Sequence, residues 1–301
     1  MLEASALTKE YPGHGRVLQG IDLVVPDGQF LAVMGPSGSG KSTLLHLLSG
    51  LDQPTSGRVL LDGQDLTRLA EKELAALRLG RLGFVFQQPR LLATLSLRDN
   101  VVLPALLAGR EPRAVVAARA EELLEEMGVA AVADHLPSQV SGGQLQRASL
   151  CRALVNGARL IMGDEPTGAL NRAAAAQVLG LLGRVHAQGC SIVLVTHDPQ
   201  VAACADRVLA LVDGAVAGDL DLREYGPTPG AGAGPEPGAA SAHQGPEALV
   251  QAKAPVPDAA AAQSARQEAG RAGPRLQGRA GQEAQATRLA QVTSLMTGLG
   301  V

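Results

Sequence analysis

The chain has 301 residues, a net charge of −3 and 46% hydrophobic residues, which is enough for a sizeable core and one or two domains. The near-neutral charge provides no basic face for nucleic acid, and aromatic residues at 2%, with no Trp, provide no stacking surface for bases. We therefore expect no nucleic-acid partner. The three cysteines are scattered and include no CxxC pair, so we expect reduced, buried thiols instead of disulfides or a zinc site.

Signals for secretion or membrane insertion are weak. Residues 1–15 carry acids where a signal peptide needs basic residues, and they include no apolar core. A spanning helix needs roughly 18 uncharged apolar residues. The apolar region 91–109 comes nearest, but it is interrupted by Arg98, Asp99, Asn100 and Pro104. The sequence therefore predicts a soluble chain.

The first 225 residues alternate between expected strands and helices. Strands are expected at 21–25, 30–34, 58–63, 82–87, 159–164, 190–196 and 207–214, and helices at 42–50, 111–128, 141–156 and 172–188. Buried apolar strands that alternate with helices indicate a parallel α/β sheet. The block between 88 and 156 interrupts this alternation, which predicts an inserted helical subdomain.

The composition changes abruptly near Tyr225, after which Gly, Ala and Pro dominate and no aromatic residue follows. Such a segment buries too little apolar surface to offset its ordering entropy, so we expect 226–280 to be a disordered linker. Apolar residues then recur at helical spacing and predict a short amphipathic helix over 282–299. An isolated helix of this length is marginal in water, so a weakly helical tail without a partner is the favoured interpretation of 226–301.

The segment GPSGSGKST, residues 35–43, directly follows the strand at 30–34 and opens a helix. Gly35, Gly38 and Gly40 let backbone amides turn toward phosphate oxygens, and the helix N-terminus attracts the same anion. Lys41 supplies a charge for the β- and γ-phosphates, and the Ser42 hydroxyl suits Mg²⁺. The pattern in this context predicts a nucleotide-binding loop. Its expected members are Gly35, Pro36, Ser37, Gly38, Ser39, Gly40, Lys41, Ser42 and Thr43.

Two adjacent acids end the segment LIMGDEPTG, residues 160–168. At the end of a buried strand, Asp164 can reach a Mg²⁺ shell and Glu165 can accept a proton from an attacking water. Alone, such a pair is more often a solvated turn. Together with the phosphate loop it predicts a hydrolytic site.

Two further motifs are ambiguous by themselves. Ser141, Gly142 and Gly143 precede a helix whose first turn exposes free amides, so they form either a second anion site or a simple N-cap. His197 ends the strand in VLVTHDP, where it either contacts a γ-phosphate or has a structural role.

In this order, the motifs resemble the nucleotide-binding domain of ATP-binding-cassette (ABC) proteins, over roughly residues 1–222. The matched positions are Walker A at 35–43, Gln87 of the Q-loop, the signature Ser141, Gly142, Gly143 and Gln144, Walker B ending at Asp164, the catalytic Glu165, the switch His197, and Tyr11, whose ring stacks on adenine in the family. The resemblance implies a P-loop NTPase with a RecA-like α/β core, an antiparallel β subdomain and a helical subdomain at about 88–156, all within 1–225. The tail has no counterpart in the family pattern.

The segment GFVFQQPRLLATLSLRDNVVLPALLAG, with DEPTGALN, looks like the branch that serves lipoprotein release, macrolide export and antimicrobial-peptide resistance. Two positions depart from the family pattern. Asn171 replaces the usual acid of the D-loop, and Val140 stands where Leu is commoner. The first puts communication through the D-loop in doubt, and the second is conservative.

The resemblance implies an ATPase that uses ATP and Mg²⁺, with Ser42, Gln87 and Asp164 around the metal and Glu165, His197 and Lys41 in catalysis. It also implies a second nucleotide-binding domain, packed head to tail, and separate membrane-spanning permease subunits that hold the chain at the cytoplasmic face of the cell membrane. Export is the favoured output. The alternatives are a cell-division-type complex that transports nothing and, less favoured, a soluble ATP-dependent switch.

Overall fold

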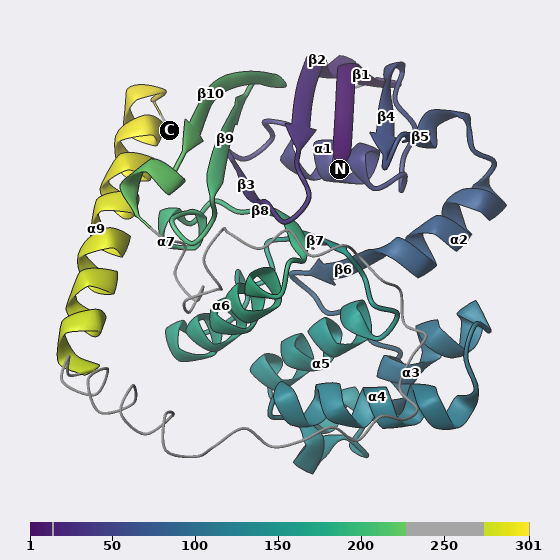
Figure 1. The fold of residues 1–301 in the computed structure, drawn as a ribbon. Helices are drawn as coiled ribbons and strands as arrows, with labels where there is room; N and C mark the ends of the chain where they lie inside the picture. Colours follow the sequence, from purple (N-terminus) through teal and green to yellow (C-terminus); the bar gives the residue numbers. More distant parts are fainter. Residues whose placement is uncertain (14, 227–273, 301) are drawn as a thin grey trace, which may run out of the picture.

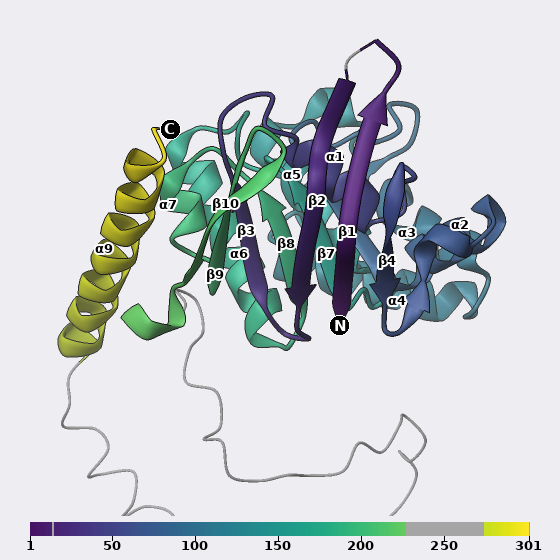
Figure 2. The same ribbon diagram turned by 90° about the horizontal axis from the view of Figure 1, so that it is seen from above.

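The computed structural model describes residues 1–13, 15–226 and 274–300, and these form two sheets (Figures 1 and 2). A four-stranded antiparallel sheet has the order β2-β1-β4-β5, and a six-stranded sheet has the order β10-β9-β3-β8-β7-β6. The strands are β1 (Leu2–Tyr11), β2 (Gly15–Val25), β3 (Phe30–Met34), β4 (Ser56–Leu61), β5 (Gln64–Asp65), β6 (Leu82–Phe86), β7 (Leu160–Asp164), β8 (Ser191–Val195), β9 (Arg207–Val212) and β10 (Ala215–Asp221).

Helices separate the strands of the larger sheet. They are α1 (Lys41–Leu48), α2 (Glu71–Arg81), α3 (Leu97–Ala108), α4 (Arg113–Glu126), α5 (Gly142–Leu154), α6 (Arg172–Ala187), α7 (Pro199–Ala202) and α9 (Pro274–Gly298), with 3-10 turns at Leu66–Arg68, Ala130–Val132, Pro137–Gln139 and Arg223–Tyr225. Strands β9, β3, β8, β7 and β6 run parallel, and only the edge strand β10 is antiparallel to its neighbour. The expected α/β fold class with a smaller antiparallel sheet is confirmed.

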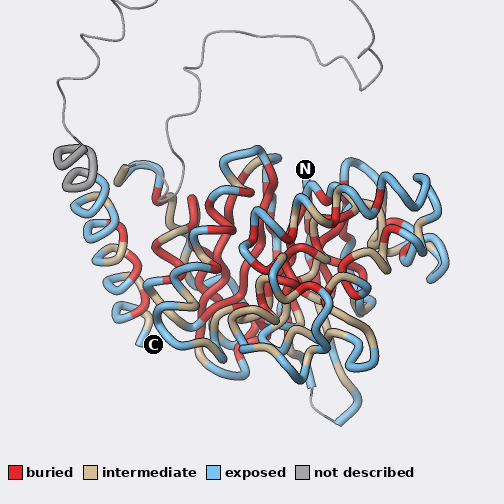
Figure 3. Tube along the Cα trace, turned by 90° about the horizontal axis from the view of Figure 1, so that it is seen from below, coloured by how far each residue is buried: buried red, intermediate tan, exposed pale blue. Residues whose placement is uncertain are grey.

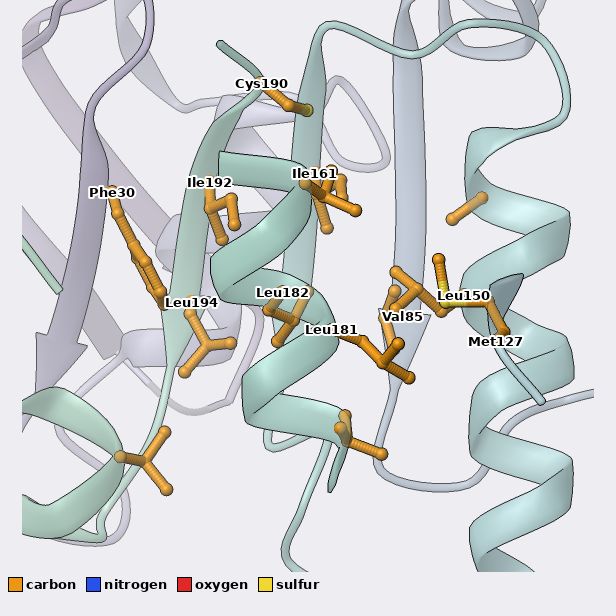
Figure 4. Close-up of a cluster of buried hydrophobic side chains, with 14 of the residues drawn as sticks. Phe30, Val85, Met127, Leu150, Ile161, Leu181, Leu182, Cys190, Ile192 and Leu194 are labelled. Atoms are coloured by element: carbon orange, nitrogen blue, oxygen red, sulfur yellow. The ribbon is translucent and has the colours of Figure 1, made fainter. Parts of the chain in front are cut away.

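The larger sheet is covered on both faces, since its central strands β3 and β8 are buried at every position and apolar at all but Ser191. In β3, Leu31 and Val33 join a core cluster with α1 and the antiparallel sheet, so α1 lies between the two sheets. Phe30, Ala32 and Met34 point the other way, into a second cluster with α6 and the helical block α3–α5 (Figure 4). Both clusters therefore pack against β3, the strand that leads into the loop at 35–43.

Two helices that the sequence analysis did not predict, α2 and α3, lie in the first half of the chain. α3 occupies most of the interrupted apolar region 91–109. Its start is set by Ser96, whose side chain accepts from the Asp99 amide at 3.0 Å, and it ends at Gly109 with φ 62°. Asp99, one of the residues that argue against a membrane span, thus takes part in the cap that begins a short helix.

The expectations about membrane spans and cysteines can also be compared with the structure. Within the described residues, no helix combines the length and apolar character needed to cross a bilayer. Cys151 and Cys190 are buried and Cys204 is half-buried. Burial raises the pKa of the Cys151 thiol to about 12 and that of Cys190 to about 11, so both stay protonated.

The tail differs from the favoured expectation of an unpartnered segment. Of the predicted linker 226–280, residues 227–273 lie outside the described residues, but 274–280 belong to α9, which begins eight residues before the helix predicted over 282–299. α9 packs against α7, β9, β10 and the 3-10 turn at Arg223–Tyr225. Figure 3 shows that burial is confined to one side of this helix. The prediction of a partnerless tail was wrong because it ignored this docking face.

The docking face of α9 carries Arg288, Val292 and Met296, spaced by four residues and exposed by 0%, 0% and 6%. The Arg288 guanidinium donates to the backbone oxygens of Ala205 and Gly226, which lie 83 and 62 residues away in sequence. A buried cation needs such partners, because an unpaired one is costly to desolvate. The helix is therefore anchored by a polar contact within an apolar stripe.

The neighbouring Asp206 joins several elements at the start of β9. Its carboxylate accepts from the Phe30 amide at 2.9 Å and lies 3.2 Å from His186 Nε2 on α6. Burial lowers the pKa of Arg288, whereas the charge of Asp206 raises it. Asp206 thus connects β3, α6 and β9 and stabilises the cation on α9.

Replacing Arg288 with Met should loosen α9 without unfolding the sheets. Methionine keeps an apolar stem but leaves the Ala205 carbonyl without its charged donor, and losing such a hydrogen bond costs about 1.5–3 kcal/mol. Hydrogen exchange of the α9 amides should therefore be about 10- to 100-fold faster, while β3 is unchanged. Thr293→Ala, on the exposed side of α9, is the matched control. Unchanged exchange in the Arg288 variant would mean that the apolar stripe alone holds the helix.

The His186–Asp206 contact should make stability depend on pH. The hydrogen bond with Asp206 raises the pKa of His186 above its usual value. This contribution is complete below the unfolded-state pKa of about 6.5 and is lost as pH rises through the higher folded-state pKa. As pH rises above about 6.5, the unfolding temperature should therefore fall more in the wild type than in His186→Gln. His135→Gln, at an exposed position, should keep the wild-type profile.

Candidate active site

The predicted functional residues lie at one edge of the larger sheet. β3, β8, β7 and β6 are adjacent and parallel, and their carboxyl ends lie within one residue of the same level: Val33 pairs with Val195, and Asp164 pairs with both Val195 and Phe86. The residues that follow these strand ends are Gly35, His197, Glu165 and Gln87. The carboxyl edge of a parallel sheet is where such folds bind ligands. Four motifs that are distant in sequence are therefore neighbours here (Figure 1).

The loop at 35–43 follows β3 and requires glycine at specific positions. A Cβ at Gly35, which has φ 152°, would lie 2.0 Å from the Leu211 carbonyl oxygen. At Gly40, which caps α1 with φ 98°, a Cβ would lie 3.0 Å from the Val17 carbonyl oxygen. The loop can turn tightly into α1 only because these side chains are absent.

Lys41 begins α1 and folds back over this loop. Its ammonium donates to the carbonyl oxygens of Gly35 at 2.9 Å and Pro36 at 2.7 Å. Burial lowers the pKa of Lys41, and the nearby carboxylates of Glu165 and Asp164 raise it. A partly desolvated cation at a helix N-terminus favours an anionic ligand.

The remaining loop residues differ in how far they are exposed. Ser37, Gly38 and Ser42 are exposed and Pro36 and Thr43 are half-buried, whereas Ser39 is buried. Ser39 is 3% exposed, and its Oγ has no hydrogen-bond partner among the described residues. Ser42 Oγ donates to Asp164 Oδ1 at 3.1 Å, which brings two hard oxygen ligands together beside the loop.

Glu165 has an unusual backbone conformation at the end of β7. Its φ is 47°, in the left-handed region, and its amide donates to the Val195 carbonyl at 3.0 Å. Its Oε1 lies 2.9 Å from His197 Nδ1. Strain of this kind is concentrated at functional sites. A cleft of about 650 Å³ opens beside this Glu–His pair and extends to Gln285 of α9.

Gly168 borders two of the predicted site residues, and the sequence analysis did not single it out. A Cβ there would lie 3.0 Å from Gln87 Nε2 and 3.2 Å from Glu165 Oε2. The glycine therefore lets the Gln87 amide approach the Glu165 carboxylate. The only signal in the sequence is the glycine that ends the DEPTG segment.

The signature residues lie on α5, which packs against α3, α4, α6 and β6 and is set apart from α1 (Figure 1). Ser141 caps this helix: its Oγ accepts from the Gln144 amide at 3.3 Å, and Gln144 Oε1 accepts from the Ser141 amide at 2.8 Å. Ser141 and Gly142 are exposed, and Gly143 and Gln144 are half-buried. The N-cap interpretation therefore holds, and the same exposed helix start is available to a second molecule.

Asn171 of the D-loop has a structural role that its departure from the pattern conceals. Its Oδ1 accepts from the Ala174 amide at 2.9 Å and caps α6. Asn and Asp are equally good N-caps, so replacing the acid leaves the helix start intact.

Tyr11 ends β1 near the first turn of α1. Its hydroxyl donates to Asp52 Oδ2 at 2.7 Å, and it also interacts with the Thr43 side chain. Burial, followed by the hydrogen bond to Asp52, raises the pKa of the Tyr11 phenol. The ring is therefore held, neutral, beside the phosphate loop.

Comparison with known proteins agrees with the resemblance inferred from the motif order. The ABC transporter family matches residues 18–168. Macrolide export ATP-binding/permease protein MacB 1 of Aeromonas hydrophila is 48% identical over 232 residues, covering 76% of this chain and 35% of that protein. MacB 1/2 of Paracoccus denitrificans is 47% identical over 235 residues, covering 77% and 35%. The chain thus spans about a third of the length of these curated relatives.

Solved structures match the same share of the chain. The ATP-binding cassette MJ0796, in a dimeric post-hydrolysis state bound to ADP and Pi, has a TM-score of 0.70 and 37% identity, covering 74% of this chain and 99% of that one. The cbiO1 subunit from Clostridium perfringens, part of the ABC transporter complex cbiONQ, has a TM-score of 0.67 and 27% identity, covering 74% and 89%.

Substitution of the loop glycines should separate steric exclusion from backbone strain. Gly35→Ala puts a Cβ against a backbone carbonyl that cannot move alone, so it should lower the free energy of unfolding by more than about 2 kcal/mol. Gly38 has φ 82° and nothing within 4 Å of its Cβ position. Gly38→Ala should therefore cost only the left-handed strain of about 1–2 kcal/mol. Thermal and denaturant unfolding of both variants tests this order, and equal losses would contradict it.

Proposed function

The chain belongs to the ABC transporter family, and from this premise we propose that it binds and hydrolyses ATP as the nucleotide-binding part of a membrane exporter. One observation carries the proposal: the phosphate loop, the Ser42–Asp164 pair and the Glu165–His197 pair meet at one sheet edge. A kinase-like transfer needs no exposed Ser141 helix start and no histidine beside the acid. On this proposal both act on one nucleotide, His197 from this chain and the Ser141 helix start from a second copy.

The residues at this edge fit ATP with Mg²⁺. The loop amides and Lys41 suit the phosphates, and the buried, unpartnered Ser39 Oγ provides a further polar atom at the loop. Within the described residues no cluster of three His, Cys, Asp or Glu side chains could hold a metal by itself. Mg²⁺ typically uses one or two protein ligands together with substrate phosphates, which agrees with the Ser42–Asp164 pair and with Gln87 at the margin. When bound, the metal neutralises charge on the transferring phosphoryl group.

The Glu165 carboxylate is the general base in this proposal. It lies beside the phosphate loop, and its hydrogen-bond distance to His197 fixes one carboxylate oxygen and leaves the other toward Gly168. Lys41 stabilises the charge that develops on the γ-phosphate, and His197 orients the reacting groups. The Gln87 amide and the second Glu165 carboxylate oxygen both border Gly168, so we propose that a change at the Q-loop alters the surroundings of the base.

A complete site requires two nucleotide-binding units. The signature helix α5 is set apart from the phosphate loop of its own chain, and its exposed start lies beside Leu170 and Ala174 instead. The proposal is that a second copy supplies its Ser141, Gly142, Gly143 and Gln144 to the ATP bound here. The dimeric, ADP- and Pi-bound state of MJ0796 supports this arrangement.

Export is supported by the relatives, which are named as macrolide export ATP-binding/permease proteins. On this proposal, ATP binding drives a conformational change in a membrane-spanning permease part. The same permease part keeps the chain at the cytoplasmic face of the membrane. The segment after Gln87 is the proposed contact with the permease part. In this segment the side chains of Leu92 and Leu107 are exposed by 50% and 69%. A permease contact here would remove both apolar side chains from water.

Glu165→Gln should separate ATP binding from hydrolysis. Loss of the general base should lower turnover at least about 100-fold, while ATP-dependent dimers accumulate. Phosphate release and size-exclusion chromatography, with and without Mg-ATP, measure the two effects. Lys41→Ala should abolish both, because it removes the phosphate contact. A Glu165→Gln chain with wild-type turnover would refute the catalytic assignment, and monomers at saturating Mg-ATP would refute the pairing of two copies.

A further inference from the structure

Lys9, Tyr11 and Asp52 form a charged cluster between β1 and the loop after α1. Lys9 Nζ donates to Asp52 Oδ1 at 2.7 Å and to the Gln53 carbonyl at 2.6 Å. The Tyr11 hydroxyl donates to Asp52 Oδ2 at 2.7 Å. Asp52 thus uses each carboxylate oxygen for a different donor. Both donors lie on β1, and 41 and 43 residues separate them from Asp52.

The cluster restrains both the hydroxyl and the ring of Tyr11. Lys9 Nζ lies over the ring, 4.7 Å from its centroid, and the Lys9 side chain is 11% exposed. A cation over an aromatic face is attracted to it, so this face is occupied. The hydroxyl is held at the other end of the ring axis by Asp52. The ring is therefore restrained at two points, by the cation over its face and by the carboxylate at its hydroxyl.

The anchor itself is fixed to the helix of the phosphate loop. The Asp52 amide donates to the His46 carbonyl at 3.2 Å, so the carboxylate is tied to the last turns of α1. Tyr11 also interacts with Thr43 in the first turn of that helix. Burial acts to raise the pKa of Asp52, but the hydrogen bonds from Lys9 and Tyr11 outweigh it and keep the pKa below its usual range. Asp52 therefore remains an anion.

We propose that Asp52 and Lys9 are positioning residues that hold the Tyr11 ring to receive the adenine base of ATP. The inference rests on the proposed function and deepens it, because it names what fixes the base while the loop at 35–43 fixes the phosphates. A ring that is already ordered loses less entropy when a base stacks on it. Neither residue needs to touch the nucleotide, and both act through Tyr11.

The test compares binding of Mg-ATP with binding of tripolyphosphate, which has the phosphates without the base. In the full chain, Asp52→Asn removes the shared carboxylate charge and Lys9→Met removes the cation over the ring. Each should weaken Mg-ATP binding about 3- to 10-fold, measured by isothermal titration calorimetry, and leave tripolyphosphate binding unchanged. The KM for ATP should rise by the same factor with kcat preserved.

Glu10→Gln is the matched control. It removes one acid on the same strand, where Glu10 Oε1 pairs with Arg16 Nε at 2.9 Å, away from the Tyr11 ring. It should bind both ligands as the wild type does. If Glu10→Gln weakens ATP binding as much as Asp52→Asn, the effect is general to β1 and the inference is wrong.

A double-mutant cycle separates positioning from a general structural role. In the Tyr11→Ala background, Asp52→Asn should no longer change ATP affinity, because the group through which it acts is gone. An undiminished Asp52→Asn effect in that background would overturn the inference. Mg-ATP bound equally by the wild type, Asp52→Asn and Lys9→Met would overturn it while leaving the proposed function intact. A wild-type chain that binds neither ligand would overturn the proposed function and this inference together.

Discussion

The register of the parallel strands β3, β8, β7 and β6 is the constraint on which the site depends. Hydrogen bonding pairs Val33 with Val195, and Val195 with Asp164, so the three strands end within one residue of the same level. A shift by one residue would turn every side chain to the opposite face and move Glu165 away from His197. The apolar clusters on both faces oppose such a shift, since β3 and β8 are buried throughout. Core packing therefore sets the geometry of the polar groups.

A second polar centre lies near the opposite ends of the same strands. Asp206 accepts from the Phe30 amide where β3 begins, and its own amide donates to the Phe30 carbonyl at 2.8 Å. His186 and Arg288 bring α6 and α9 to this carboxylate. A buried acid is tolerated here because every side of it meets a donor or a cation. β3 is thus held by Asp206 at one end and leads into the phosphate loop at the other.

Sequence reasoning succeeds where one local signal decides the outcome. The strand at 30–34 is wholly apolar, and GPSGSGKST allows few backbone conformations, so strand, loop and helix follow in order. It fails where the deciding contact is distant. Arg288 anchors α9 by donating to the Ala205 carbonyl, 83 residues away in sequence. The periodicity of the tail does not indicate which residues it packs against. Gly168 and Asp52 were missed for the same reason, because their importance lies in what approaches them.

The tail helix matters to the site through α7. This short helix begins directly after His197, and Asp198 caps it by accepting from the Gln200 amide at 2.8 Å. On its far side α7 packs against α9, and Gln285 of α9 lines the cleft that contains Glu165 and His197. α9 therefore packs against the helix that follows the loop carrying His197. A rigid support of this kind keeps a catalytic contact within hydrogen-bond distance, because the loop that carries it has few internal contacts of its own. The region after Tyr225, whose Gly, Ala and Pro content is least typical of a folded domain, thus contributes a helix, α9. This helix lines the cleft that contains Glu165 and His197.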